Sequence, residues 1–134
     1  MSKVRDAMVP DPHPLDASAT AQEAGARLSE PGVRAVLVCD DGVLAGVVTR
    51  KTLVREVVAL GRDPNSTRVG DIAEPPIFTL DAELDLEAAF RELEERDLER
   101  VPVTEDGRLV GILSRSVVQR RLAEDEPPVE ESSV

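Results

Sequence analysis

Pairs of apolar runs separated by a tight polar break occur twice along this chain. The runs and breaks are RAVLVC (34–39), Asp41-Gly42 and LAGVV (44–48), then RVPVT (100–104), Asp106-Gly107 and LVGIL (109–113). An Asp-Gly pair between apolar runs favours a β-hairpin, because glycine accepts the positive φ that such a turn requires. The pattern therefore predicts two hairpins.

Helical patterns precede and follow each hairpin. Thr20 and Asp85 are predicted N-caps, and the apolar residues after them recur at helical spacing. These residues are Ala21, Ala24, Gly25 and Leu28 in one stretch, and Leu86, Ala89, Phe90 and Leu93 in the other. Further helices are predicted from about Arg50 to Leu60 and from Arg115 to Ala123. Brief strands are predicted at 13–16 and 77–81, each after a proline-containing segment that favours extended backbone.

The similarity of the two hairpins extends over the whole pattern. Val4 aligns with Val69, a shift of 65 residues that needs no gap, and VLVCDDGVLAGVVTR from Val36 then falls on VPVTEDGRLVGILSR from Val101. Agreement over this length indicates an internal duplication. Each copy has the order β-α-β-β-α.

The predicted fold is α+β, with two such repeats. One copy is too small to bury a sufficient core, so the two sheets are expected to pack face to face about a pseudo-twofold axis, creating two equivalent clefts. The predicted organisation is repeat 1 over residues 1–60, a linker over 61–67, repeat 2 over 68–123 and an acidic disordered tail over 124–134.

Composition and charge argue against several classes of function. The 134 residues carry a formal charge of −11, which argues against nucleic-acid binding because phosphate neutralisation needs a basic face. There is no run of roughly 18 apolar residues of the kind that spans a membrane. The first residues contain no long apolar stretch typical of a secretory signal, so a cytoplasmic location is expected.

The sequence contains few residues of the kinds that form catalytic or metal sites. Cys39 and His13 are single residues of their kind, which leaves no disulfide and no evident metal site. Neither a Gly-rich phosphate loop nor a GxSxG or HExxH motif is present. The sequence is therefore interpreted as that of a protein that is not an enzyme.

Residues 2–123 resemble a tandem pair of cystathionine β-synthase (CBS) domains, known as a Bateman module. The duplication, the element order, the leading DAMVP and the two long matching segments carry the resemblance. The resemblance implies a regulatory module that requires no cofactor. It also implies binding of an adenosine nucleotide or S-adenosylmethionine in the clefts between repeats.

The family's characteristic turn is Gly-hydrophobic-hydrophobic-Thr/Ser-x-x-Asp, in which the hydroxyl contacts phosphate or ribose and the aspartate holds the ribose hydroxyls. The two copies here match it at Gly46 with Thr49 and at Gly111 with Ser114. The aspartate position holds Thr52 in the first copy and Val117 in the second. Because hydrogen bonds to a carboxylate are about twice as strong as neutral ones, ribose anchoring is expected to be weakened at Thr52 and doubtful at Val117.

Other candidate ligand-binding residues have alternative interpretations. Arg50 and Arg115 follow the hydroxyls and either meet a phosphate or pair with nearby acids. Ile77, Phe78, Val101 and Pro102 resemble the family's adenine-facing strands, although as core residues they would need no ligand.

Two functions remain open. The first is a sensor that binds an adenosyl ligand in one cleft and signals to an unidentified protein partner. The second is a ligand-independent dimerisation or interaction module whose ribose sites have been lost. The resemblance also implies a homodimer formed through the terminal helix of each repeat. Apolar stripes suited to this contact are Leu53, Val54, Val57 and Val58 on the first such helix, and Val117, Val118 and Leu122 on the second.

Overall fold

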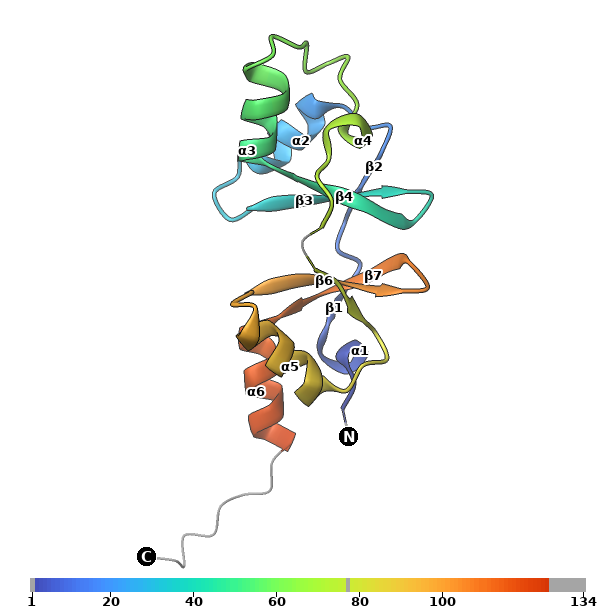
Figure 1. Ribbon diagram of the computed structural model, residues 1–134, viewed down its shortest axis with the longest axis vertical. Coiled ribbons are helices and arrows are strands. Elements are labelled where there is room, and N and C mark those ends of the chain that lie inside the picture. Colours follow the sequence, from blue (N-terminus) through green and yellow to red (C-terminus); the bar gives the residue numbers. More distant parts are fainter. Residues whose placement is uncertain (1, 77, 126–134) are drawn as a thin grey trace, which may run out of the picture.

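The computed structural model describes residues 2–76 and 78–125. Figure 1 shows the two hairpins in the middle of the molecule, with a group of helices outside each of them. The elements up to the linker are α1 (Val4–Ala7), β1 (Val9–Pro10), β2 (Leu15–Asp16), α2 (Ala21–Leu28), β3 (Ala35–Asp40), β4 (Val43–Thr49), α3 (Arg50–Leu53) and the π-helical segment η1 (Val54–Val58). Those after it are α4 (Val69–Ile72), β5 (Leu80–Asp81), α5 (Leu86–Glu95), β6 (Arg100–Glu105), β7 (Arg108–Ser114) and α6 (Arg115–Asp125).

The α+β duplication is confirmed down to the pairing of the strands. In each copy a short strand runs parallel to the first hairpin strand, and the hairpin is antiparallel with a register shift at the same place, between Val38 and Cys39 and between Val103 and Thr104. Asp41 and Asp106 have φ of 51° and 52°, so the predicted tight turns are present. The two hairpins are joined where Val43 pairs with Arg108, which makes one seven-stranded sheet.

The predicted helix starts are also correct. Thr20 accepts a hydrogen bond from the Glu23 amide at 3.2 Å, and Asp85 accepts one from the Ala88 amide at 3.3 Å. The helix predicted from Arg50 widens to a π-helix at Val54 and ends at Val58. In contrast, α6 continues to Asp125, two residues into the segment expected to be a disordered tail. Residues 126–134 lie outside the described residues.

Two aliphatic cores form, and each includes a helix from the other copy's leading segment. Val4 of α1 packs with Leu80, Leu86 and Leu93 of the second half, whereas Val69 and Ile72 of α4 join the core of the first half. Hence the first half comprises β2, α2, β3, β4, α3 and η1 with α4. The second half comprises β5, α5, β6, β7 and α6 with α1.

This exchange follows the duplication closely. The Val4 amide donates to the Leu84 carbonyl at 2.9 Å, and the matching Val69 amide donates to the Ala19 carbonyl at 2.8 Å. β1 pairs antiparallel with β7, and the matching residue Glu74 bridges to Val47 of β4. Each half therefore completes its own core and sheet with a segment that the chain supplies from the other copy.

Candidate functional site

The first predicted turn places Thr49 at the end of β4, where it caps α3. Its Oγ1 accepts a hydrogen bond from the Thr52 amide at 3.3 Å, while Thr52 Oγ1 accepts one from the Thr49 amide at 3.0 Å. The two hydroxyl oxygens are 3.1 Å apart, and Thr52 has no exposed surface. In this conformation Thr52 completes a capping box, so its hydroxyl faces the helix start and not solvent.

The second turn also leads from a strand end directly into a helix, but its side-chain chemistry is different. Ser114 lies at the end of β7, and its Oγ is 3.0 Å from the Ser116 Oγ. The half-buried residue at the family's aspartate position is Val117, which has no polar side-chain atom. The reciprocal bonding of the first turn is therefore not available to this residue.

The two arginines after the hydroxyls have different partners. Arg50 is exposed and donates from Nη2 to the backbone carbonyl of Glu30 at 3.0 Å. Arg115 is 29% exposed, with Nη1 3.3 Å from Asp97 Oδ1 and Nε 3.5 Å from Glu99 Oε2. A phosphate would have to compete with two carboxylates for Arg115, whereas Arg50 meets only a neutral carbonyl.

Both glycines of the turns have a packing reason. A Cβ on Gly46 would lie 2.6 Å from the Glu74 carbonyl oxygen, and one on Gly111 would lie 2.8 Å from the Val9 carbonyl oxygen. These carbonyls belong to the leading segments that cross from the other copy. The absence of a side chain is therefore required by the exchanged backbone, whether or not a ligand binds.

The apolar candidates lie mainly in the protein interior. Val101 is 2% exposed within the second core, and Pro102 beside it is buried. Phe78 is half-buried, and its ring centroid lies 4.1 Å from the Arg96 guanidinium carbon, within cation–π range. Ile77 lies outside the described residues. Of these residues, the structure gives Phe78 a partly exposed aromatic surface.

Sequence reasoning missed the exchange of leading segments and the contact of Arg96 with Phe78. The apolar Val4 and Val69 were a usable signal for the exchange, but sequence alone does not show which core an apolar residue joins. Cys39 is buried, and burial raises the pKa of its thiol, which keeps it protonated. Across residues 2–76 and 78–125, no group of three or more His, Cys, Asp or Glu is arranged to hold a metal ion.

The repeated fold, the exchanged helices and the paired hydroxyl turns define a tandem-repeat module of the Bateman type. The CBS domain family matches residues 4–59 and 69–124. The chain therefore belongs to the CBS domain family, as a pair of CBS domains. None of the helices in the described ranges has the length and apolar content needed to cross a membrane.

Several proteins are similar over most of this chain. Hypoxic response protein 1 of Mycobacterium tuberculosis is 33% identical over 106 residues, which is 78% of this chain and 74% of the relative. Its crystal structure with two coordinated zinc ions superposes with a TM-score of 0.74 at 30% identity, covering 90% of this chain and 99% of that one.

Two further proteins are also similar over most of this chain. CBSX2, in a crystal structure in complex with AMP, is 29% identical with a TM-score of 0.71, covering 92% of this chain and 98% of that one. The CBS domain-containing protein YhcV of Bacillus subtilis is 28% identical over 114 residues, which is 85% of this chain and 81% of the relative.

Proposed function

We propose that this protein is a regulatory CBS pair that binds an adenosyl ligand between its repeats and transmits the binding to a protein partner. The ligand class is that of AMP, ADP, ATP and S-adenosylmethionine. The duplicated turn, with a hydroxyl at the strand end followed by an arginine at the helix start, carries the proposal. The AMP complex of CBSX2, a relative with 29% identity, supports it.

The first turn is the better anion site of the two. Arg50 is exposed and has a neutral carbonyl as its partner, whereas Arg115 is engaged with Asp97 and Glu99. A guanidinium that does not already pair with a carboxylate is the stronger attraction for a phosphate. We therefore assign the phosphate contact to Thr49 and Arg50.

The affinity of this site is expected to be modest. Hydrogen bonds to a charged group contribute about 1.5–3 kcal/mol, and neither Thr52 nor Val117 supplies a carboxylate to the ribose. Since about 1.4 kcal/mol corresponds to a factor of ten, the loss amounts to one or two orders of magnitude in Kd. A ligand such as AMP should then bind in the micromolar range or more weakly.

The alternative function, a ligand-independent interaction module, has its own support. Thr52 is fully buried and bonded to Thr49, and Arg115 is already paired with acids. Both features satisfy polar groups without a ligand. In this alternative the pair of repeats serves as a rigid scaffold for dimerisation or for a partner protein.

Zinc is not carried over from hypoxic response protein 1. Zinc sites in proteins are built mainly from Cys and His, usually four ligands in a structural site. This chain has one residue of each kind, and the described side chains form no cluster of possible ligands. The side chains present do not fit a zinc site, so we assign no structural or functional role to a metal.

Calorimetry with AMP, ADP, ATP and S-adenosylmethionine tests the proposal. We expect saturable AMP binding, lost in Arg50→Ala and retained in Arg115→Ala. Arg62→Ala in the linker is the matched control and should bind like the parent protein. An absence of heat with all four ligands, together with unchanged thermal unfolding at millimolar ligand, would favour the interaction module.

Self-association is the remaining part of the proposal. We place the protein in the cytoplasm as a homodimer formed through its outer helices, where Val54 and Val58 are exposed apolar residues. The regulated partner would then meet a surface shared by two copies. Sedimentation over a concentration series that gave only monomers would contradict the homodimer.

A further inference from the structure

The second turn carries groups suited to an anion beyond those of the motif itself. Ser114 ends β7, Arg115 follows it, and Arg100 of β6 pairs with Ser114 across the hairpin. Residues directly opposite each other in such a pair lie on the same face of the sheet. In the first half, the residue that pairs with Thr49 is Ala35. Arg100 is exposed and forms no ion pair within the described part of the chain, so it is free to meet a ligand.

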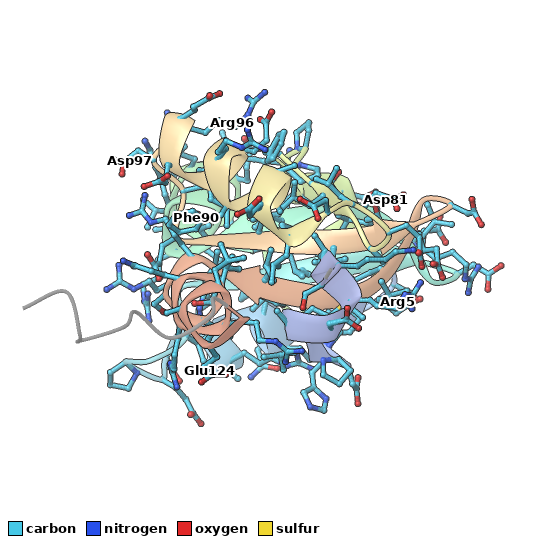
Figure 2. All side chains as sticks on the ribbon, turned by 90° about the horizontal axis from the view of Figure 1, so that it is seen from below. Arg5, Asp81, Phe90, Arg96, Asp97 and Glu124 are labelled. Carbon is cyan, nitrogen blue, oxygen red and sulfur yellow. The ribbon has the colours of Figure 1, made fainter. Side chains whose placement is uncertain are left out.

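Two carboxylates of the chain itself occupy the guanidinium of Arg115. Asp97 Oδ1 lies 3.3 Å from Nη1, and Glu99 Oε2 lies 3.5 Å from Nε. The Glu99 carbonyl also accepts a hydrogen bond from the Arg115 amide at 2.8 Å, which holds Glu99 beside the start of α6. Asp97 lies at the end of α5 in Figure 2, with a φ of 52°. We call Asp97 and Glu99 the acidic pair.

The first half has no acidic residue at either position of the acidic pair. The shift of 65 residues places Gly32 on Asp97 and Arg34 on Glu99. Arg34 directly precedes β3 and Glu99 directly precedes β6, so the two residues stand at the same place in their hairpins. The second half therefore has an anion where the first half has a cation, next to the arginine that follows the hydroxyl.

We propose that the acidic pair is a specificity determinant that keeps the second turn free of ligand, so that each chain binds one adenosyl ligand, at its first turn. This inference rests on the proposed function. Carboxylates fixed beside a guanidinium compete with a phosphate for the same donors and repel its charge. The missing ribose aspartate explains less of the difference, because neither Thr52 nor Val117 has a carboxylate.

Removing the two charges should open the second turn as a ligand site. Asp97→Asn combined with Glu99→Gln keeps the shape of both side chains, and Asn also tolerates the positive φ. Equilibrium dialysis with labelled AMP should give one bound ligand per parent chain and two per chain of this double variant. Adding Arg115→Ala should abolish the new site. Glu94→Gln combined with Glu95→Gln changes the charge of α5 equally at exposed positions away from Arg115, and this matched control should bind like the parent protein.

Amide chemical shifts in ¹H–¹⁵N spectra show which turn the ligand occupies. In the parent protein, AMP should shift the amides of Thr49 and Arg50 and leave those of Ser114 and Arg115 in place. In the double variant, AMP should shift all four amides. Unchanged shifts at the second turn of the double variant would mean that the acidic pair is not what excludes the ligand.

The converse substitution places an acid beside the first turn. Arg34→Glu reproduces the residue of the second half next to Arg50, and the affinity for AMP should fall about tenfold. Arg34→Gln, which adds no carboxylate, should have a smaller effect. Equal effects of the two variants would show that a carboxylate at this place does not compete with the ligand.

Failure of this inference is distinguishable from failure of the proposed function. If AMP shifts the first-turn amides and the double variant still binds one ligand, the proposed function stands and the acidic pair does not set the occupancy. Two ligands bound per parent chain would overturn the inference in the same way. If AMP binds to neither the parent protein nor the double variant, the proposed function itself is wrong, and this inference falls with it.

Discussion

The two halves of this molecule share the features that let their chains turn and cross, and they differ at the start of the outer helices. Both glycines that allow the crossing segments to approach, Gly46 and Gly111, are present, and both hairpins turn at Asp-Gly. The helix starts differ, with a capping box between Thr49 and Thr52 in one half and Val117 in the other. The shared features therefore belong to the fold, and the differences bear on the proposed ligand site.

The outer helices show the largest divergence. The first half has a π-helical segment with exposed valines, whereas the second half has a regular helix that forms a groove with α5. π-Helical segments are rare and frequently occur at functional sites. Many core positions are nonetheless equivalent in the two copies, such as Leu28 and Leu93.

The largest expected effect is a loss of stability on core substitution, which tests whether the two halves unfold together. Leu28 and Leu93 are equivalent core residues, 2% and 0% exposed, and replacing either by Ala should cost about 2–5 kcal/mol. Because each core contains a helix from the other copy, both variants should show one transition in urea, shifted to lower concentration. Two separate transitions, detected by circular dichroism and by hydrogen exchange in each half, would contradict this coupling.

Glycine substitutions compare the two places where a leading segment passes close to the sheet of the other half. Gly46→Ala and Gly111→Ala should each lower the free energy of unfolding by about 1–3 kcal/mol through overpacking. The effect should be larger at Gly46, where the new Cβ meets the Glu74 carbonyl and the Ala73 Cβ. At Gly111 the backbone carbonyl of Val9 lies slightly farther away, at 2.8 Å, and the other close atom is the Met8 Sδ, at 2.7 Å, which belongs to a flexible side chain.

Gly32→Ala is the matched control for these variants. No atom lies within 4 Å of a Cβ at this position, so its unfolding free energy should stay within about 0.5 kcal/mol of the parent value. Urea titrations at constant protein concentration give all three values. Equal effects at Gly32 and Gly46 would show that close approach of the backbone is not the reason for the glycines.

Introducing an aspartate at the family's aspartate position should show which of the two turns binds the ligand. Thr52→Asp keeps an acceptor for the Thr49 amide and adds charge for a ribose diol, so AMP affinity by calorimetry should rise about tenfold. Val117→Asp should have a smaller effect, because Arg115 already pairs with Asp97 and Glu99. The uncharged Thr52→Asn is the control. A gain at Val117 that exceeds the gain at Thr52 would reverse our assignment of the site.

Much of this fold was predictable from the sequence, because its signals are local. Asp-Gly pairs between apolar runs predicted the hairpins, and Thr20 and Asp85 predicted the helix starts through their side-chain acceptors. The π-helix at Val54 was not predictable, since it depends on how α3 packs. The exchange of α1 and α4 is also non-local, because burial of Val4 or Val69 is equally satisfied by either core.

The candidate site was predictable in residue identity but not in geometry. Arg50 and Arg115 occupy equivalent sequence positions, yet their partners are contributed by the loops after α2 and α5. Asp97 reaches Arg115 because the loop after α5 turns through a positive φ at this residue. The family motif indicates which residues to examine, whereas the local partners determine which of them is free to bind an anion.

The smallest expected effect concerns the ion pairs that hold α1, compared with the equivalent helix α4. Lys3 and Arg5, at the start of the chain, pair with Glu83 at 2.6 Å each, and Arg5 also contacts Glu105. In Figure 2, Arg5 lies at the end of the second half that carries α1. The residue of α4 that matches Arg5 is Gly70, which has no side chain for an ion pair. Acidification should therefore loosen α1 more than α4.

The direction of this pH effect follows from the pKa of Glu83. Hydrogen bonds from Lys3 and then from Arg5 lower this pKa below its ordinary value of 4.5, so the unfolded chain binds the proton more readily. The stabilisation is complete above about pH 4.5 and is lost as the pH falls through the folded pKa. Between pH 6 and pH 3, hydrogen-exchange protection of the Met8 amide should fall more than that of the equivalent Ala73 amide. Glu83→Gln should remove this excess at Met8 and leave Ala73 unchanged, whereas an equal loss at both amides in the parent protein would mean that the ion pairs do not hold α1.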